Sequence, residues 1–257
     1  MCYDDQARPP VPPGPSGATS TEDLVLTASD GNRFSAFAAY PAQTGTAAVL
    51  IYPDVRGLHQ FYKDLATRFA ETGTAALALD YFGRTAGLTS RDEPFEFMPH
   101  VQQLGLDTFT LDVEAGLAYL RTRLGALPIF VVGFCMGGAL TLQTGTNAAL
   151  GFAGLLPFYP GLRRPFGGQG TALENAERIC YPVRAFFGGA DQGIPESDVQ
   201  QLEEKLTAAG VDHELKIYPG APHSFFDRRA ADYAAESSDA WQRVLAFIAE
   251  WKEPAAR

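Results

Sequence analysis

One cysteine of this sequence stands where an apolar strand would turn sharply into a helix. Cys135 is flanked by glycines in the stretch Gly133-Phe134-Cys135-Met136-Gly137, after the apolar run IFVV and before a helix-forming segment. The order strand, G-x-C-x-G, helix is typical of a nucleophile elbow, with cysteine in place of the more common serine. The dipole of a helix N-terminus favours a thiolate at this position. We therefore expect Cys135 to be a nucleophile, the alternatives being an inert buried thiol or a phosphate-binding turn.

Two further residues follow strands in the order that a hydrolase elbow requires. Asp191 comes shortly after the apolar run 183–187, and His223 lies in the loop after the run 214–218. Because the C-terminal ends of neighbouring parallel strands converge on one crevice, both side chains should meet Cys135 there. A thiol needs a base and the base needs an orienting acid, which predicts a triad of Cys135, His223 and Asp191. The remaining histidines are expected to be structural or on the surface: His59, His100 and His213.

An oxyanion hole needs two backbone N–H groups aimed at the developing negative charge. Met136, the residue after the nucleophile, would supply one of them. The other should come from the loop PDVRG, residues 53–57, which follows the apolar run 47–52. Because Pro53 has no N–H group, we expect Val55 to be the second donor.

The segments that must position these residues alternate between apolar runs and stretches of helical period, which predicts an α/β fold. We expect eight strands: Leu24 to Thr27, Phe34 to Tyr40, Ala47 to Tyr52, Ala75 to Leu79, Ile129 to Val132, Ala153 to Phe158, Val183 to Phe187 and Glu214 to Tyr218. We expect five helices: Gln60 to Thr72, Thr108 to Leu124, Met136 to Thr144, Glu196 to Ala209 and Asp232 to Glu250. An Asp-Gly turn between the first two strands predicts an antiparallel pair. The rest of the eight-stranded sheet should be mostly parallel, with helices on both faces.

The chain is expected to hold one domain behind a proline-rich arm. Residues 1–20 contain five prolines together with Gly and Ser (RPPVPPGPSG), which is too many for a helix or a central strand. Residues 21–257 fit a single large α/β domain. Within it, the segment 81–105 is long and irregular and leaves the edge of the sheet where ligands bind, so we expect it to have a functional role.

Composition argues against several classes of function. A net charge of -10 and a pI near 4.8 would repel nucleic acid and anionic lipid. No apolar run approaches the roughly 20 residues that span a membrane. The three cysteines form no C-x-x-C pair, so we expect no disulfide framework, no zinc site and a cytoplasmic location. None of the four histidines has Cys or acidic neighbours at metal-site spacing, so we expect no metal, and we expect no cofactor.

The sequence resembles the dienelactone hydrolase family of α/β-hydrolases over roughly residues 22 to 250. The resemblance rests on GFCMGG at the elbow, GGADQGIP around the acid and YPGAPHSFF around the histidine. It implies the α/β-hydrolase fold and a triad of Cys135, His223 and Asp191.

The resemblance also implies roles for charged residues around the triad. In the family, an acidic residue of the oxyanion loop holds or deprotonates the resting thiol; it is Glu in the best-known members and Asp54 here. Arg84 in DYFGR matches an arginine that helps to bind the substrate carboxylate. A second family arginine falls on Asp227 in this chain. The neighbouring Arg228 and the loop residue Arg56 are the other candidates for substrate binding.

A thiol nucleophile narrows the expected substrates. A tetrahedral intermediate expels the group that is the weaker base. The pKa of a thiol is about 8.5, whereas the pKa of an alcohol is close to that of water, about 16, so the thiolate leaves more readily than an ordinary alkoxide. An enol ester expels a far less basic enolate, so a cysteine elbow favours activated small-molecule lactones and esters. We expect a monomeric or small homo-oligomeric hydrolase of enol lactones or related esters that works through a thioester, with a broad carboxylesterase as the close alternative. A binding or redox-sensing module with Cys135 as its sensor thiol is the third hypothesis.

Overall fold

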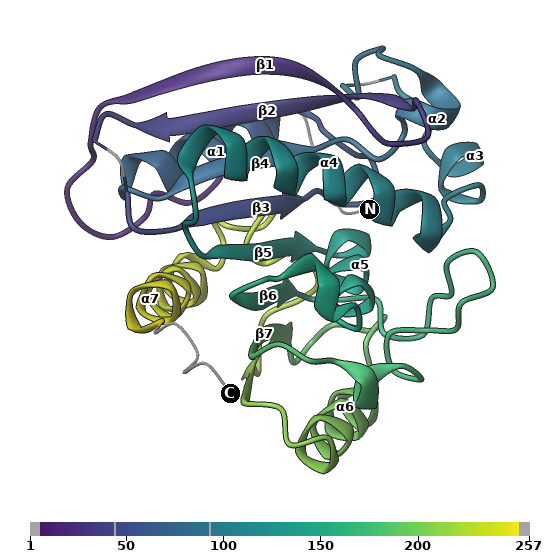
Figure 1. The fold of residues 1–257 in the computed structure, drawn as a ribbon. Coiled ribbons are helices and arrows are strands. Elements are labelled where there is room, and N and C mark those ends of the chain that lie inside the picture. Colours follow the sequence, from purple (N-terminus) through teal and green to yellow (C-terminus); the bar gives the residue numbers. More distant parts are fainter. Residues whose placement is uncertain (1–5, 44, 93, 252–257) are drawn as a thin grey trace.

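The computed structural model describes residues 6–43, 45–92 and 94–251, which form an eight-stranded sheet in the order β1-β2-β4-β3-β5-β6-β7-β8 (Figure 1). β2 pairs antiparallel with both β1 and β4, and every later pair is parallel. The strands are β1 (Thr19–Thr27), β2 (Arg33–Pro41), β3 (Ala48–Tyr52), β4 (Ala75–Leu79), β5 (Ile129–Phe134), β6 (Gly154–Phe158), β7 (Val183–Gly188) and β8 (His213–Tyr218). The expected mostly parallel α/β sheet is confirmed.

Helices connect the parallel strands and cover the sheet. The α-helices are α1 (Gln60–Glu71), α2 (Gly83–Ala86), α3 (Met98–Val101), α4 (Leu106–Leu124), α5 (Met136–Thr144), α6 (Glu196–Ala208) and α7 (Ala234–Glu250). Two short 3-10 helices, Ala148–Leu150 and Ala176–Arg178, complete the elements. No helix among the described residues combines the length and the apolar character needed to cross a membrane.

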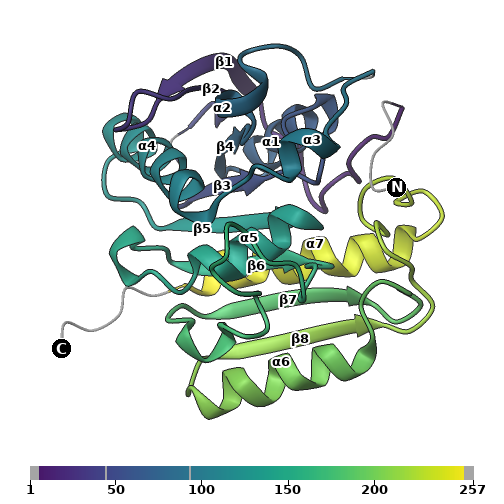
Figure 2. The ribbon, with the colours of Figure 1, turned by 90° about the vertical axis from the view of Figure 1, so that its right-hand side faces the viewer.

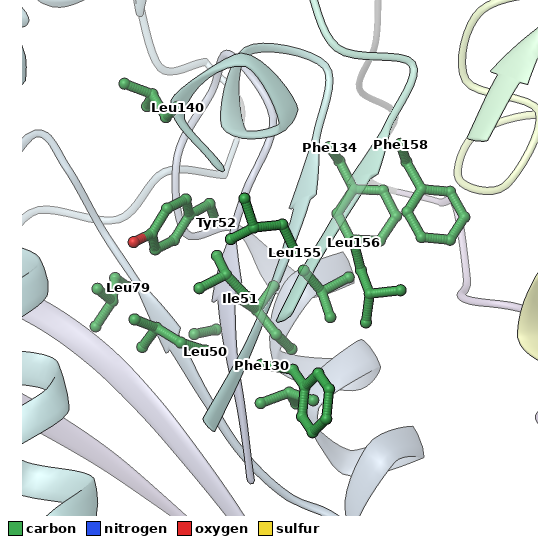
Figure 3. Close-up of a cluster of buried hydrophobic side chains, with 14 of the residues drawn as sticks. Leu50, Ile51, Tyr52, Leu79, Phe130, Phe134, Leu140, Leu155, Leu156 and Phe158 are labelled. Carbon is green, nitrogen blue, oxygen red and sulfur yellow. The ribbon is translucent and has the colours of Figure 1, made fainter. Parts of the chain in front are cut away.

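Alternation along the strands sends neighbouring side chains to opposite faces of the sheet. On one face, Phe130 of β5 meets Phe247 of α7 with ring centroids 5.4 Å apart. On the other face, Tyr52 of β3 meets Phe109 of α4 at 4.9 Å. Figure 3 shows this buried core between the strands, including Phe134 and Phe158, which stack at the ends of β5 and β6. The core thus reaches the strand ends from which the site is built.

Most predicted boundaries agree with the structure, and all five long helices end within two residues of the expected positions. The predicted start of the first strand, Leu24, is wrong, because β1 begins at Thr19. Its added residues, TSTED, are polar and mostly exposed, as suits an edge strand, and so they lack the apolar alternation that signals a strand. β5 also continues past Val132 to Phe134. The short helices α2 and α3 lie inside the segment 81–105, where none was expected.

A buried ion pair fixes the segment 81–105 against the end of β4. Asp80 and Arg91 are both almost fully buried. The Arg91 guanidinium donates two hydrogen bonds, of 3.1 and 2.9 Å, to the two carboxylate oxygens of Asp80. Asp80 also accepts from the N–H of Leu58, in the loop after β3. Next to it, the Tyr81 hydroxyl contacts the carbonyl oxygens of Pro53 and Asp54. The end of β4 therefore holds the loop that was expected to form the oxyanion hole.

The described part of the predicted arm packs along the protein surface from α1 to α7 (Figure 2). The N–H of Gly17 donates to the carbonyl of Glu71 at the end of α1. The indole N–H of Trp241, on α7, donates to the carbonyl of Pro10 at 2.9 Å. Residues 19 and 20, assigned to the arm by the sequence, already belong to β1, and residues 1–5 lie outside the described residues.

Candidate active site

The predicted elbow is present between β5 and α5. Cys135 has φ 53° and ψ -110°, a strained conformation for a residue with a side chain. A Cβ at Gly133 would overlap the carbonyl of Gly137, and a Cβ at Gly137 would overlap the carbonyls of Tyr52 and Pro53. The two glycines are therefore required by the close approach of β5, α5 and the loop after β3. Cys135 projects from this turn at the N-terminus of α5.

Asp191 and His223 form the second part of the site. The His223 Nδ1 lies 2.6 Å from Oδ2 of Asp191, whose side chain is 3% exposed. The other carboxylate oxygen accepts from the N–H of Gly193 at 2.8 Å. Because an ionised carboxylate can only accept, Nδ1 is the nitrogen that carries the proton, and this leaves Nε2 as the acceptor. The side chain of His223 is 27% exposed, so the pair opens to solvent on the histidine side.

Tyr159, which the sequence analysis did not identify, links the elbow to the histidine. It follows β6, and the N–H of Cys135 donates to the carbonyl of the preceding Phe158 at 3.1 Å. The ring centroids of Tyr159 and His223 are 4.9 Å apart. The Tyr159 hydroxyl donates to Oδ2 of the buried Asp227 at 2.8 Å. At the end of β6, Tyr159 therefore contacts the loop of His223, and the preceding Phe158 bonds to the backbone of Cys135.

Backbone strain is concentrated at this edge of the sheet. Among the described residues, the non-glycine residues with positive φ are Cys135 (53°), Tyr159 (35°) and Ser224 (62°). Ser224 directly follows His223 and is fully buried. Such conformations persist where the surrounding structure imposes them, which is common at active sites. The only signal for Tyr159 and Ser224 in the sequence is their position at strand ends or beside the histidine.

The loop after β3 is ordered by its own hydrogen bonds. The N–H of Arg56 donates to Oδ1 of Asp54 at 2.9 Å, and that of Gly57 donates to the Asp54 carbonyl at 3.1 Å. Among the described residues, the N–H of Val55 takes part in none of the hydrogen bonds that order this loop. Met136 is the first residue of α5, where the N–H has no partner inside the helix. The loop that carries Val55 approaches the first turn of α5, where Met136 lies, through the carbonyl of Pro53, and the assignment of Val55 and Met136 as oxyanion donors stays a prediction.

The side chain of Asp54 is buried in this loop and faces a histidine that was expected to be structural. Asp54 is 1% exposed, and its Oδ2 lies 3.5 Å from Nε2 of His59, which is 3% exposed. His59 caps α1 in an extended conformation without a capping bond from its side chain. The other two histidines lie elsewhere: His100 stacks on Phe95, and His213 is the first residue of β8.

The three arginines expected to bind substrate have different surroundings. The Arg84 guanidinium contacts Asp30 in the turn between β1 and β2 and bonds to Asp112 of α4 at 2.8 Å. It donates in addition to the carbonyl of Thr108. Arg56 is fully buried, whereas Arg228 is exposed and only its backbone N–H bonds to the Asp227 carboxylate. Arg84 is therefore already paired with two carboxylates of this chain.

The Asp112 carboxylate beside Arg84 gives a test of how strongly this cluster is buried. Burial raises the pKa of Asp112 to about 6, although Asn32 and Arg84 both stabilise its charge. A raised folded-state pKa stabilises the protein below the unfolded value near 3.8, and this contribution is lost as the pH rises toward 6. Relative to Asp112→Asn, the wild-type free energy of unfolding should thus fall by about 2 kcal/mol between pH 4 and pH 7. Urea denaturation of both proteins across this range measures it, and a constant difference would contradict the prediction.

The cysteine at the other end of the molecule differs from Cys135. Cys180 precedes β7 and therefore lies at the N-terminal ends of the parallel strands, opposite to the ends that carry Cys135. Burial raises the pKa of its thiol. Cys2 lies outside the described residues. In the part of the chain that the structure describes, no group of three His, Cys, Asp or Glu side chains could hold a metal ion.

Known sequences are similar to this chain over most of its length. A model of the dienelactone hydrolase family matches residues 34–251. A protein of Synechocystis sp. named "Putative carboxymethylenebutenolidase" is 29% identical over 232 residues, which cover 86% of this chain and 93% of the relative. A Methylorubrum extorquens protein with the same name is 30% identical over 233 residues, which cover 84% and 76%.

Solved structures agree at the level of the fold. The crystal structure of a protein described as a "Putative Dienelactone Hydrolase" from Klebsiella pneumoniae has a TM-score of 0.80 and 22% identity, covering 91% of this chain and 100% of its own. An esterase of Pyrococcus furiosus has a TM-score of 0.67 and 18% identity, covering 94% and 99%. These likenesses establish an α/β-hydrolase architecture. With the family match over most of its length, the chain belongs to the dienelactone hydrolase family.

Proposed function

We propose that this protein hydrolyses activated carboxylic esters, enol lactones among them, through a triad of Cys135, His223 and Asp191. The observation that carries the proposal is the buried Asp191 carboxylate 2.6 Å from His223, at the sheet edge where the strained Cys135 projects. The family and the names of the relatives support a hydrolase, since a carboxymethylenebutenolidase opens a lactone ester.

The proposed reaction proceeds in two halves. The thiolate of Cys135 attacks the carbonyl carbon, and the N–H groups of Met136 and Val55 receive the negative charge of the tetrahedral oxygen. Collapse breaks the bond to the enolate oxygen and leaves a thioester on sulfur. A water molecule then gives a proton to Nε2 of His223 and attacks the thioester, and the proton passes to the departing thiolate or to solvent. Asp191 holds the histidine in the tautomer that this step needs.

A neutral ester as substrate is the second candidate, and a specific contact favours it. A substrate carboxylate would need a guanidinium whose charge is not already neutralised, and Arg84 is paired with both Asp30 and Asp112. Asp227, at the position of the second family arginine, adds a buried carboxylate that contacts Tyr159 beside the histidine. A negative charge at the site repels an anionic ligand. Uncharged activated esters therefore suit this site better than dicarboxylic lactones.

Rapid mixing with 4-nitrophenyl acetate tests the proposal. A burst of about one nitrophenolate per chain should precede steady turnover, because a thioester accumulates when its hydrolysis is slower than its formation. Iodoacetamide should label Cys135 ahead of Cys180 and abolish the burst. A neutral enol ester should be hydrolysed faster than its carboxylate analogue. Labelling of Cys135 with full retention of turnover, or binding of esters with no release of product, would reject the proposal in favour of a binding or sensing role.

A further inference from the structure

We propose that His59 is a positioning residue for Asp54, and that the two side chains form a buried acid–base pair that sets the charge next to Cys135. The inference rests on the proposed function, because it concerns the reactivity of the nucleophilic thiol. It assigns a role to a histidine outside the triad.

The geometry isolates the two side chains from solvent and places them next to each other. His59 Nε2 and Asp54 Oδ2 are 3.5 Å apart, and the two side chains are 3% and 1% exposed. Neither ring nitrogen of His59 has a hydrogen-bond partner among the described residues. The N–H of Arg56 occupies Oδ1 of Asp54, which leaves Oδ2 as the oxygen nearest to His59. Charges that are this close and this well buried interact far more strongly than charges in water.

Two contacts connect this pair to the nucleophile. The backbone next to Asp54 packs against Gly137 in the first turn of α5, so closely that a Cβ there would overlap the Pro53 carbonyl. The ring of Tyr62 touches that of His59 on one side and that of Phe134 on the other, at 4.9 and 5.6 Å. Phe134 immediately precedes Cys135 in the chain.

The pKa of Tyr62 indicates that the charge of Asp54 acts toward the elbow. Burial raises the pKa of this fully buried phenol well above its usual value, and the carboxylates of Asp54 and Asp227 raise it further. The same field that opposes a phenolate packed on Phe134 would oppose a thiolate on the next residue.

The other titratable and charged groups described near His59 come from the loop after β3, from α1 and from the segment after α2. Arg56 comes from the same loop as Asp54, and Tyr62 from α1. Asp92, from the segment after α2, accepts from the N–H of Gln60 at 3.3 Å. Burial opposes the ionisation of Asp92, but hydrogen bonds from Ser90 and the Gln60 N–H, and the charges of Arg56 and His59, lower its pKa overall.

Within the pair, the positive charge of His59 offsets that of the Asp54 carboxylate, so that a thiolate forms nearby without strong repulsion. Without His59, Asp54 is a buried carboxylate that disfavours a second negative charge nearby. His59 therefore lowers the pH at which Cys135 becomes reactive, although it does not touch the substrate.

The test is the pH dependence of iodoacetamide alkylation of Cys135, followed by mass spectrometry of the peptide that contains it. In His59→Asn, the midpoint of the profile should move upward by about one pH unit, equivalent to a tenfold loss of rate below the midpoint. In an Asp54→Asn background, the same His59→Asn change should have no effect. His100→Asn is the matched control, since this histidine stacks on Phe95 and makes no ion pair with a described carboxylate, and its profile should be that of the wild type.

The variants are compared only if their near-ultraviolet circular dichroism is native, and His59→Gln replaces His59→Asn if the latter does not fold. An unchanged midpoint in the folded His59 variant, or an equal shift with and without Asp54, would overturn the inference. A normal rate of ester hydrolysis by Cys135→Ala would instead refute the proposed function. The alkylation profiles decide between the two failures because they do not depend on turnover.

Discussion

Replacing Cys135 by alanine is expected to lower kcat/KM for 4-nitrophenyl acetate by at least about 1,000-fold. The variant retains the oxyanion donors and the His223 pair but cannot form a thioester. No burst should remain, and iodoacetamide should have no effect on the residual rate. Alanine is preferred to serine, because a hydroxyl in an elbow can itself act as a nucleophile.

Cys180→Ala is the matched control for this experiment. Cys180 lies before β7 at the opposite edge of the sheet, where its thiol donates to the carbonyl of Gly145. Its replacement should leave kcat/KM and the burst within twofold of the wild type. Less than a tenfold loss in Cys135→Ala, or an equal loss in the two variants, would show that Cys135 is not the nucleophile.

Asp191→Asn is expected to lower kcat by about 1,000- to 10,000-fold with little loss of stability. Asp191 accepts from His223 Nδ1 and from the N–H of Gly193, and an amide of the same shape can keep only one of these bonds as an acceptor. Its NH2 group would favour the tautomer in which Nε2 carries the proton, so the histidine could no longer act as a base. Steady-state kinetics and thermal unfolding measure the two effects separately.

Asp198→Asn provides the comparison for Asp191→Asn. Asp198 is similarly buried and pairs with Arg163 through hydrogen bonds of 2.7 and 2.6 Å, but it belongs to α6. Its replacement should change stability and leave kcat nearly constant. If Asp191→Asn lowered the melting temperature in the same way and kcat by less than tenfold, Asp191 would be a structural carboxylate.

The sequence predicts the framework of the site because chain topology determines it. Residues that directly follow parallel strands must lie at one edge of the sheet, and Cys135, Asp191 and His223 all follow such strands. The glycines on either side of Cys135 also indicate the elbow, because the close approach of β5 and α5 leaves no room for side chains there. These rules use only order and spacing along the chain.

The residues that the sequence did not reveal depend on contacts that no local sequence pattern signals. The partners of Arg84 are Asp30 and Asp112, 54 and 28 residues away along the chain, and no local pattern pairs them. Tyr159 contacts His223 because the ends of two strands converge. A tyrosine after a strand is common, so nothing in the sequence signals this contact. His59 resembles any polar residue before a helix until the fold brings Asp54 to its ring.

Strain at Cys135, Tyr159 and Ser224 has a consequence for how this sequence would change under selection. Each side chain held at positive φ costs the native state of the order of 1–3 kcal/mol, a cost that glycine avoids. A library of variants selected only for heat resistance should therefore accumulate glycine or asparagine at Cys135 and Ser224, whose side chains are small, and keep Tyr159, which is fully buried and bonds to Asp227. A library selected for turnover should keep the native residues at Cys135 and around it, and recover stability at positions remote from the strand ends. Sequencing the survivors of the two selections would separate residues retained for chemistry from those retained for folding.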